Sequence, residues 1–318
     1  MARYHRAMSF FAVLMALLLE QVRPVSYDNP AHALMRSWAR STGRHLDTGE
    51  AAPAWVAWTA AVVLPSVVVA VVHAWLAHLS LLLALAWLVL VLYLTLGFRQ
   101  FSHHFTAIRQ AMETGDEAAA RQYLAQWLRV DATTLPRTEL LRHVIEHSVL
   151  SAHRHVFGVL LAFFVCWFLG LGPAGAVVYR LAEYVAGRWK RSEGGHAHSV
   201  LGSVAQRAWH VVDYVPARMT ALAFAIVGNF EEAVASWRSD AARYAPGGDG
   251  IVLAATAGAI NVRLGAADAP DEDGIASQGR AEPQIGHLAS AVGLVWRSVV
   301  LWMLFLLLAT LAGWRVWS

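Results

Sequence analysis

The strongest membrane signal in the chain runs from Trp55 to Phe98 and contains no Lys, Arg, Asp or Glu over 44 residues. A helix rises about 1.5 Å per residue, and about 20 helical residues cross the hydrocarbon core of a bilayer. The stretch is too long for one crossing, so it predicts a hairpin of two membrane helices, about Trp55–His73 and Leu79–Phe98. In this prediction His73 and His78 flank the turn.

Further apolar segments lie on both sides of this stretch. Ala7–Leu19 follows two arginines and has no small-residue cleavage site behind it, so it predicts an uncleaved first membrane helix; a cleaved signal peptide is the alternative. Val156–Val178 is interrupted by Gly and Pro, which predicts a broken or re-entrant element. Met219–Gly228 is too short to cross alone, and Leu294–Trp314 predicts a last span.

The composition agrees with a membrane protein. The chain is 57% hydrophobic and only 15% charged, whereas soluble domains have about a quarter of their residues charged. Its 14 Trp residues suit the headgroup zone of a bilayer. The small net charge of +3 and the lack of a basic, aromatic-rich soluble domain exclude nucleic acid as a partner. The lone Cys166 excludes an intrachain disulfide and a Cys-based zinc site.

The predicted fold is therefore all-α: a polytopic helical membrane protein with polar helical segments between its spans. Residues 99–155 are polar and rich in arginine, with helix breaks at Gly115-Asp116 and Leu135-Pro136. The positive-inside rule places residues 21–54 and 99–155 in the cytoplasm. We expect one domain over residues 1–318, with residues 266–290 as a flexible linker before the last span.

One candidate for chemistry is a metal site on the polar helix Pro136–His155. His143, Glu146 and His147 spell H-x-x-E-H, the pattern of one class of zinc peptidases. Residues four apart share a helix face, so both imidazoles could hold Zn²⁺ while the carboxylate acts as a base. The alternative is that these side chains hydrogen-bond within a helical bundle. A third ligand is also needed, and Asp213, Glu231 and Glu232 are the candidates.

Other polar side chains stand at the thresholds of apolar segments. His153 begins the apolar stretch around residue 156, and Asp213 and Arg218 precede the one at residue 219. Ionisable groups at this depth face protein or water, so they predict either a pocket for an anion or contacts with headgroups. Arg263 ends a small-residue run that favours close helix packing. The sequence has no G-x-x-x-x-G-K-[ST] motif, so no P-loop supports use of ATP.

Several motifs, taken in order, resemble the CobD/CbiB family of cobalamin-biosynthesis membrane proteins and its relative AmpE. The resemblance covers residues 8 to 265 and rests on four elements. They are Gly115-Asp116 with Ala120-Arg121, followed by Asp131, Leu135, Arg142 and Glu146; Gly172–Ala176 with Tyr179-Arg180; Pro216-Ala217-Arg218 with Thr220; and the run Ala257–Gly265.

The family resemblance implies adenosylcobinamide-phosphate synthesis, in which a corrinoid carboxylate is joined to an aminopropanol or its phosphate as an amide, with ATP and Mg²⁺. No other cofactor is evident. On this basis the expected catalytic residues are Asp131 and Glu146. The expected substrate-binding residues are Arg142, His153, Arg180, Asp213, Arg218 and Arg263. We expect Asp131, Arg142, Glu146, Arg218 and Arg263 to converge on one polar cavity that faces the cytoplasm.

The chain also departs from the enzymes of this family. Leu150–His155 stands where they have an acidic and polar stretch, and Leu181–Tyr184 replaces a second polar motif. Other features resemble AmpE, among them Val212–Pro216, Val227-Gly228-Asn229 and the single C-terminal span. AmpE-like proteins are associated with signalling in cell-wall or β-lactamase regulation.

Three functions therefore stay open. They are a corrinoid-acting synthase, an AmpE-like signalling protein with a partner protein, and a metal-dependent membrane hydrolase. In each case the expected location is the bacterial inner membrane, with multiple passes, and an oligomer is compatible with the sequence.

Overall fold

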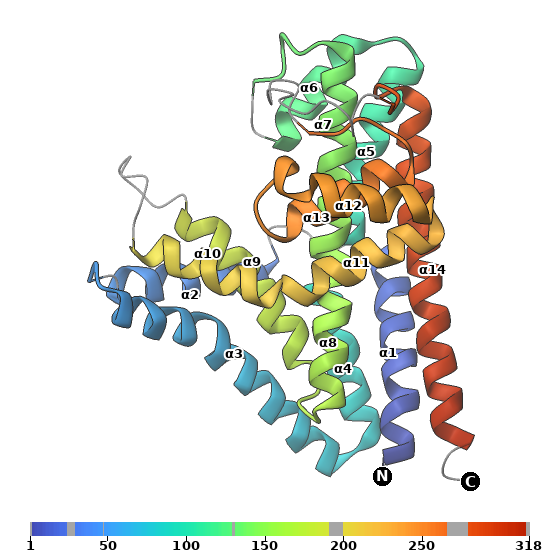
Figure 1. The fold of residues 1–318 in the computed structure, drawn as a ribbon. Coiled ribbons are helices and arrows are strands. Elements are labelled where there is room, and N and C mark those ends of the chain that lie inside the picture. Colours follow the sequence, from blue (N-terminus) through green and yellow to red (C-terminus); the bar gives the residue numbers. More distant parts are fainter. Residues whose placement is uncertain are drawn as a thin grey trace. The chain divides into compact units, whose positions relative to one another are not determined.

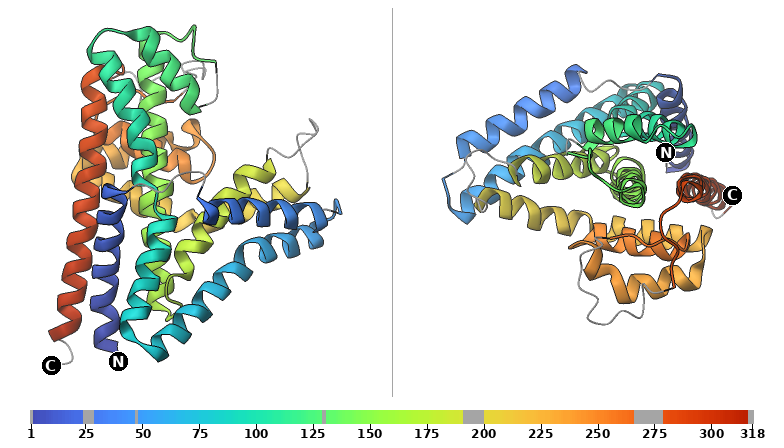
Figure 2. Two further views of the ribbon diagram at one scale, coloured as in Figure 1. Left: turned by 180° about the vertical axis from the view of Figure 1, so that it is seen from behind. Right: turned by 90° about the horizontal axis from the view of Figure 1, so that it is seen from above.

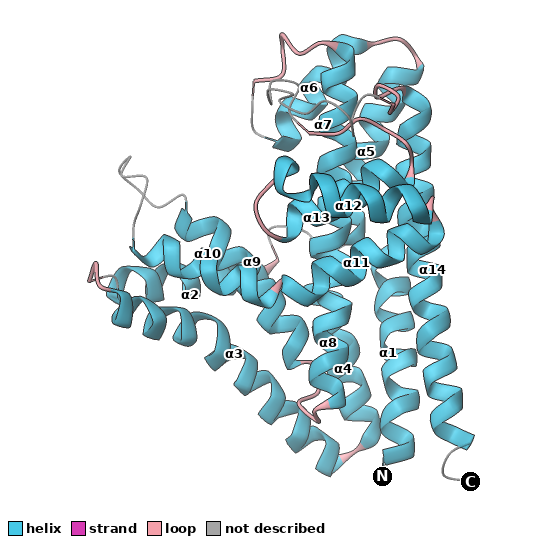
Figure 3. Cartoon of the chain, viewed as in Figure 1, coloured by secondary structure: helices cyan, strands magenta, loops and turns pink. Residues whose placement is uncertain are grey.

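The computed structural model describes residues 2–23, 29–46, 48–128, 131–190, 200–265 and 279–315. These residues form helices and connecting loops (Figure 3), with one isolated β-bridge between Val262 and Ala281. The predicted all-α fold is confirmed. The chain divides into two compact units.

Unit 1 comprises Met1–Gly97, Arg154–Tyr214 and Thr310–Ser318. Its helices (Figure 1) are α1 (Ala2–Val22), α2 (Pro30–Leu46), α3 (Ala51–Leu79), α4 (Leu81–Thr95), α8 (Gly158–Phe168), α9 (Ala174–Lys190) and α10 (Val200–Val212).

Unit 2 comprises Phe98–His153 and Val215–Ala309. Its helices are α5 (Phe98–Glu113), α6 (Glu117–Leu128), α7 (Arg137–Ala152), α11 (Tyr214–Val227), α12 (Phe230–Tyr244), α13 (Gly248–Ala259) and most of α14 (Ile285–Arg315). A π-helical turn, η1 (His153–Phe157), follows α7 in the chain.

The predicted apolar hairpin is present as α3 and α4, but its turn lies later in the sequence than expected. α3 continues to Leu79, and the extended Ser80 separates it from α4. His73 and His78 therefore lie inside α3 rather than beside the turn. The reason is that no residue between 73 and 79 breaks a helix. The indole N–H of Trp87 donates to the Val69 carbonyl at 3.3 Å and joins the two arms.

Among the described residues, three helical stretches are long and apolar enough to cross a membrane: Ala51–Leu79, Arg137–Phe168 and Ile285–Leu311. α10 and α11 together make a fourth candidate, bent by 47° between them. Ser9–Val22 of α1 and α4 are apolar but shorter. The first helix and the last span are thus present as predicted, and Met219–Gly228 belongs to the bent pair.

The predicted break in Val156–Val178 is confirmed, because α8 ends at Phe168 and α9 begins at Ala174. The part before the break continues one helical stretch that begins at Arg137, which the sequence did not indicate. The break comes at the following glycines, where Gly170 (φ 78°) and Gly172 (φ 59°) adopt left-handed conformations that favour glycine. A Cβ on Gly172 would lie 2.4 Å from the His73 ring, so this turn packs tightly on α3.

Small residues let the helices of unit 1 approach closely. α9 packs against α8 and α3, and a Cβ at Gly175 would lie 1.9 Å from the carbonyl oxygen of Ala162 in α8. α1 and α4 run side by side (Figure 2), and the Tyr93 hydroxyl donates to the Arg23 carbonyl at 2.7 Å. Close backbone approach is the means by which helices associate in lipid, where burial of apolar surface between helices gives little.

Unit 2 has a similar close pair in α12 and α13. A Cβ at Gly258 would lie 2.2 Å from the Glu232 carbonyl oxygen, and one at Gly228 would lie 2.7 Å from the Ala259 Cβ. The Asn229 N–H donates to the Ala259 carbonyl at 3.1 Å, and its side chain caps α12 by accepting from the Glu232 N–H. This pair fixes the start of the segment that follows α13.

We expect Gly175→Ala to destabilise the protein by about 1–3 kcal/mol, because backbone atoms on the facing helix leave no room for the new methyl group. The unfolding temperature of the detergent-solubilised protein measures the effect. Gly293→Ala in α14 is the matched control, since nothing lies within 4 Å of its added Cβ. Equal unfolding temperatures for the two variants would contradict the packing argument.

Candidate functional site

Three charged side chains of α7 form the centre of the candidate site. Arg142 forms an ion pair with Glu139, one turn earlier, and its Nε lies 3.8 Å from Oε1 of Glu146, one turn later. The Arg142 side chain is only 10% exposed. A guanidinium buried to this extent needs anionic and hydrogen-bonding partners, and the two flanking carboxylates supply the negative charge.

These α7 side chains hold the end of the small-residue run at Gly265. The Gly265 N–H donates to Oε1 of Glu146 at 2.7 Å, and Nη1 of Arg142 donates to the Gly265 carbonyl oxygen. Gly265 has φ 87°, a left-handed conformation that explains the glycine. Both backbone polar groups of Gly265 are thereby hydrogen-bonded to side chains of a single helix. We call Arg142, Glu146 and Gly265 the Gly265 clamp.

A second buried ion pair lies beside the clamp and joins Arg280 to Asp240 of α12. Nη1 of Arg280 lies 3.1 Å from Oδ2 of Asp240, and both side chains are more than nine-tenths buried. The same nitrogen lies 3.4 Å from the Tyr244 hydroxyl oxygen. The ring of Tyr244 covers Gly265, where an added Cβ would lie 2.9 Å from Cδ1. Burial raises the pKa of the Tyr244 phenol.

Asp240, Tyr244 and Arg280 were not among the residues expected from the sequence. Arg280 lies inside the segment 266–290 that was expected to be a linker. Of that segment, residues 266–278 lie outside the described residues, and α14 begins at Ile285. Little in the sequence indicates a role for Arg280, because a single arginine in a polar stretch shows no periodic pattern. Its role depends on a carboxylate 40 residues earlier.

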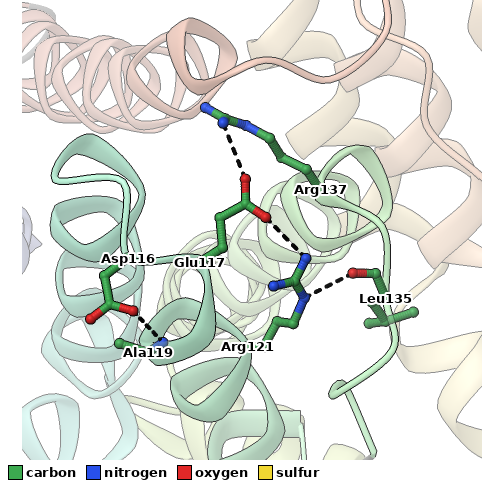
Figure 4. A network of polar contacts seen from close by, with 6 residues as sticks. All are labelled: Asp116, Glu117, Ala119, Arg121, Leu135 and Arg137. Atoms are coloured by element: carbon green, nitrogen blue, oxygen red, sulfur yellow. Dashed lines mark hydrogen bonds and ion pairs between the residues drawn. The ribbon is translucent and has the colours of Figure 1, made fainter.

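The motif around Gly115-Asp116 builds a polar network between α6 and α7 (Figure 4). Asp116 caps α6 by accepting from the Ala119 N–H at 2.9 Å. Glu117 pairs with Arg121 at 3.0 Å and with Arg137 at 3.2 Å, and Nε of Arg121 donates to the Leu135 carbonyl at 2.9 Å. The network fixes the connection that leads into α7.

Asp131, an expected catalytic residue, lies in the exposed loop between α6 and α7. Its Oδ1 accepts from the Thr133 N–H at 3.0 Å and from the Thr133 hydroxyl at 2.6 Å. These hydrogen bonds lower the pKa of the Asp131 carboxyl. Asp131 therefore stabilises the turn at Thr133. Among the described residues it makes no contact with the Gly265 clamp.

His153 is completely buried at the start of η1. Its Nδ1 lies 2.9 Å from the hydroxyl oxygen of Thr220 in α11, and that hydroxyl also donates to the Pro216 carbonyl at 2.9 Å. π-helical turns recur at functional sites. This contact joins His153 to the Pro-Ala-Arg-x-Thr element through Thr220, a pairing that the sequence did not predict. Arg218 of the same element is half-buried.

Asp213 and Arg180 belong to unit 1. The buried Tyr179 hydroxyl donates to Oδ1 of Asp213 at 2.7 Å, and burial, with the nearby Asp213 carboxylate, raises the Tyr179 pKa well above its usual value. Gly158 makes room for the Tyr179 ring, because an added Cβ would lie 2.1 Å from it. Arg180 pairs with Glu183 at 3.0 Å.

Arg263 lies two residues before Gly265, and its backbone is hydrogen-bonded there. Its side chain is exposed, while its backbone N–H donates to the Ala281 carbonyl at 2.8 Å. Thus the structure brings Arg142, Glu146 and the Arg263 segment together. The five-residue cavity remains a hypothesis.

The histidines proposed as metal ligands have other neighbours. The His147 ring packs edge-on against Trp127 with centroids 4.5 Å apart, and His104 stacks on the same indole. Nδ1 of His143 lies 3.9 Å from Oε2 of Glu146. No group of three His, Cys, Asp or Glu side chains within the described ranges is arranged to hold a metal ion. The residues that the structure describes therefore supply no third ligand for the hydrolase hypothesis.

The clamp combines a cation and a carboxylate beside a glycine backbone. Oε1 of Glu146 is used by the Gly265 N–H, and Oε2 faces His143. Such an arrangement can orient a carboxylate as a proton acceptor and can place positive charge near an anionic group.

The spans and polar clusters define a polytopic helical membrane protein. The model of the CobD/Cbib protein family matches residues 10–295, so the chain belongs to the CobD/CbiB family of cobalamin biosynthesis proteins. The cobalamin biosynthesis protein CobD of Stutzerimonas stutzeri (strain A1501) is 32% identical over 322 residues, covering 96% of this chain and 98% of the relative.

A second relative, the protein of the same name from Chromobacterium violaceum, is 33% identical over 177 residues, covering 56% of this chain and 54% of the relative. No solved structure gives a significant match.

We expect Glu146→Ala to destabilise unit 2 by about 1–3 kcal/mol, because it leaves a partly buried N–H unpaired and removes a countercharge of the buried Arg142. Glu146→Gln keeps a carbonyl oxygen for Gly265 and is expected to cost less. Thermal unfolding of the purified protein compares them. Asp131→Ala, an exposed carboxylate, is expected to stay near wild type, and a loss as large as that of Glu146→Ala would contradict the clamp.

Proposed function

We propose that the protein is an enzyme of the adenosylcobinamide-phosphate synthase type in the bacterial inner membrane. It would join a corrinoid carboxylate to the amine of an aminopropanol or its phosphate. ATP would take up the carboxylate oxygen that leaves when the amide forms. The observation that carries the proposal is the family match over residues 10–295, together with a relative named for cobalamin biosynthesis that aligns over nearly its whole length.

The contacts of the Gly265 clamp also support this proposal. Two separated family motifs, Arg142 with Glu146 and the run that ends at Gly265, meet there through two hydrogen bonds. In the proposed reaction Oε2 of Glu146 takes the proton that the amine loses when it attacks the activated carboxyl. Arg142 provides the positive potential beside the negatively charged phosphate or carboxylate.

Mg²⁺ commonly accompanies ATP in such reactions. The part of the chain that the structure describes holds no three-ligand acidic or histidine group for it.

A specific observation favours a second candidate function, AmpE-like signalling without synthase activity. The segment Leu150–His155 replaces the acidic stretch of the enzymes, and Ser151, Ala152 and His153 are buried. Packed side chains at these positions are poor ligands for a soluble substrate. A partner protein, rather than a corrinoid, would then be the ligand.

A complementation experiment separates the two. The chain is expressed in a bacterium that lacks its own CbiB, and cobalamin-dependent growth without added cobinamide is measured. We expect growth with wild type and a loss of roughly 10²–10⁴-fold in synthase rate for Glu146→Ala in a purified assay, the range for a general base. Arg238→Ala, on an exposed position of α12, is the control and should match wild type.

No growth with the wild-type chain correctly inserted in the membrane would reject the synthase and favour signalling. Growth that is unaffected by Glu146→Ala would keep the pathway role and reject the assigned base.

A further inference from the structure

Helix α2 of unit 1 carries three arginines at four-residue intervals, Arg36, Arg40 and Arg44. Residues four apart lie on one face of a helix, so the guanidinium groups form a stripe along α2. Arg40 and Arg44 are exposed, and Arg36 lies half-buried at the edge. We call these residues the α2 arginine stripe.

The opposite face of α2 is held against unit 1. The indole N–H of Trp38 donates to the Ala60 carbonyl of α3 at 3.3 Å. The indole N–H of Trp189 in α9 donates to the Ala39 carbonyl at 3.2 Å. Gly43 leaves room for the Trp189 ring, since an added Cβ would lie 2.9 Å from its Nε1. These contacts keep the stripe on the outer side of the unit.

The position of α2 relative to its neighbours indicates the depth of the stripe. α2 lies between α1 and α3 in sequence and runs crosswise to α1 and α4, at the level where α1 ends (Figure 2). α3 packs against α2 and begins directly after Glu50, and a charged side chain is costly in hydrocarbon. Trp55 and Trp58 near its start suit the headgroup zone. Both features indicate the headgroup level for the neighbouring α2.

The charges on this face suit phosphate. Nε of Arg40 donates to the Arg36 carbonyl at 3.2 Å, a hydrogen bond that uses none of the hydrogens on the two terminal nitrogens. No acidic side chain of the described residues forms an ion pair with Arg40 or Arg44. Guanidinium groups bind phosphate with paired hydrogen bonds. Leu34 on the exposed side, 70% accessible, offers an acyl chain an apolar contact.

We propose that the α2 arginine stripe binds the headgroups of anionic phospholipids, with Arg40 and Arg44 as the principal contacts. The stripe is separate from the Gly265 clamp, so this site does not depend on the proposed synthase activity. A bound anionic lipid would tie the edge of unit 1 to the cytoplasmic leaflet.

The test uses the full-length protein in lipid nanodiscs of phosphatidylcholine that contain increasing phosphatidylglycerol. Native mass spectrometry of the released protein measures retained phosphatidylglycerol. One arginine near an anionic surface strengthens binding about fivefold. The double variant R40Q/R44Q is therefore expected to need on the order of 25-fold more phosphatidylglycerol for the same occupancy. R238Q/R243Q, two exposed arginines of α12, is the matched control and should behave as wild type.

The unfolding temperature in nanodiscs of phosphatidylcholine alone checks that the variants are folded. The variant R40K/R44K keeps the positive charge but lacks the planar guanidinium groups, so it tests whether charge alone retains part of the lipid binding. Equal retention by wild type and R40Q/R44Q, or equal loss in the α12 control, would overturn the proposal. So would displacement of the lipid by millimolar inorganic phosphate, which would indicate a soluble anion as the ligand.

Discussion

Every backbone N–H and C=O that enters a bilayer needs a partner within the protein, and the rest of this structure depends on that constraint. It explains why the long uncharged stretch becomes two helices separated at a single residue, Ser80. Hydroxyl groups inside the apolar helices obey it as well. Ser66 donates to the Val62 carbonyl at 2.7 Å, and Thr95 donates to the Val91 carbonyl at 2.8 Å.

The same constraint directs the charged residues into short, local pairs. The Gly265 clamp and the Asp240–Arg280 pair satisfy buried charges within unit 2, and the Glu117 network fixes the approach to α7. Buried pairs contribute little net stability against an apolar alternative, but removal of one partner is costly. Their value here is positional, because they hold irregular backbone around Gly265 beside the charged face of a helix.

The family motifs therefore have different physical roles. Asp116 caps α6, and Arg121 ties α6 to the Leu135 carbonyl just before α7. Arg142 and Glu146 instead bind the backbone of Gly265, while Oε2 of Glu146 faces His143. Thr220 lies within hydrogen-bond distance of the buried His153. A motif residue that packs and one that can meet a substrate look alike in sequence, since both are polar residues at fixed spacing.

The sequence by itself determined the all-α membrane class, the apolar hairpin, the breaks at Gly115 and Pro136 and the family, because hydropathy and helix breakers act locally along the chain. Only the tertiary structure decided the turn at Ser80, the continuous helix from Arg137 to Phe168 and the clamp. Arg280 and Asp240 pair across 40 residues, and Glu146 meets Gly265 across 119. Such pairs have no local signal, because folding brings their side chains together only when the helices pack.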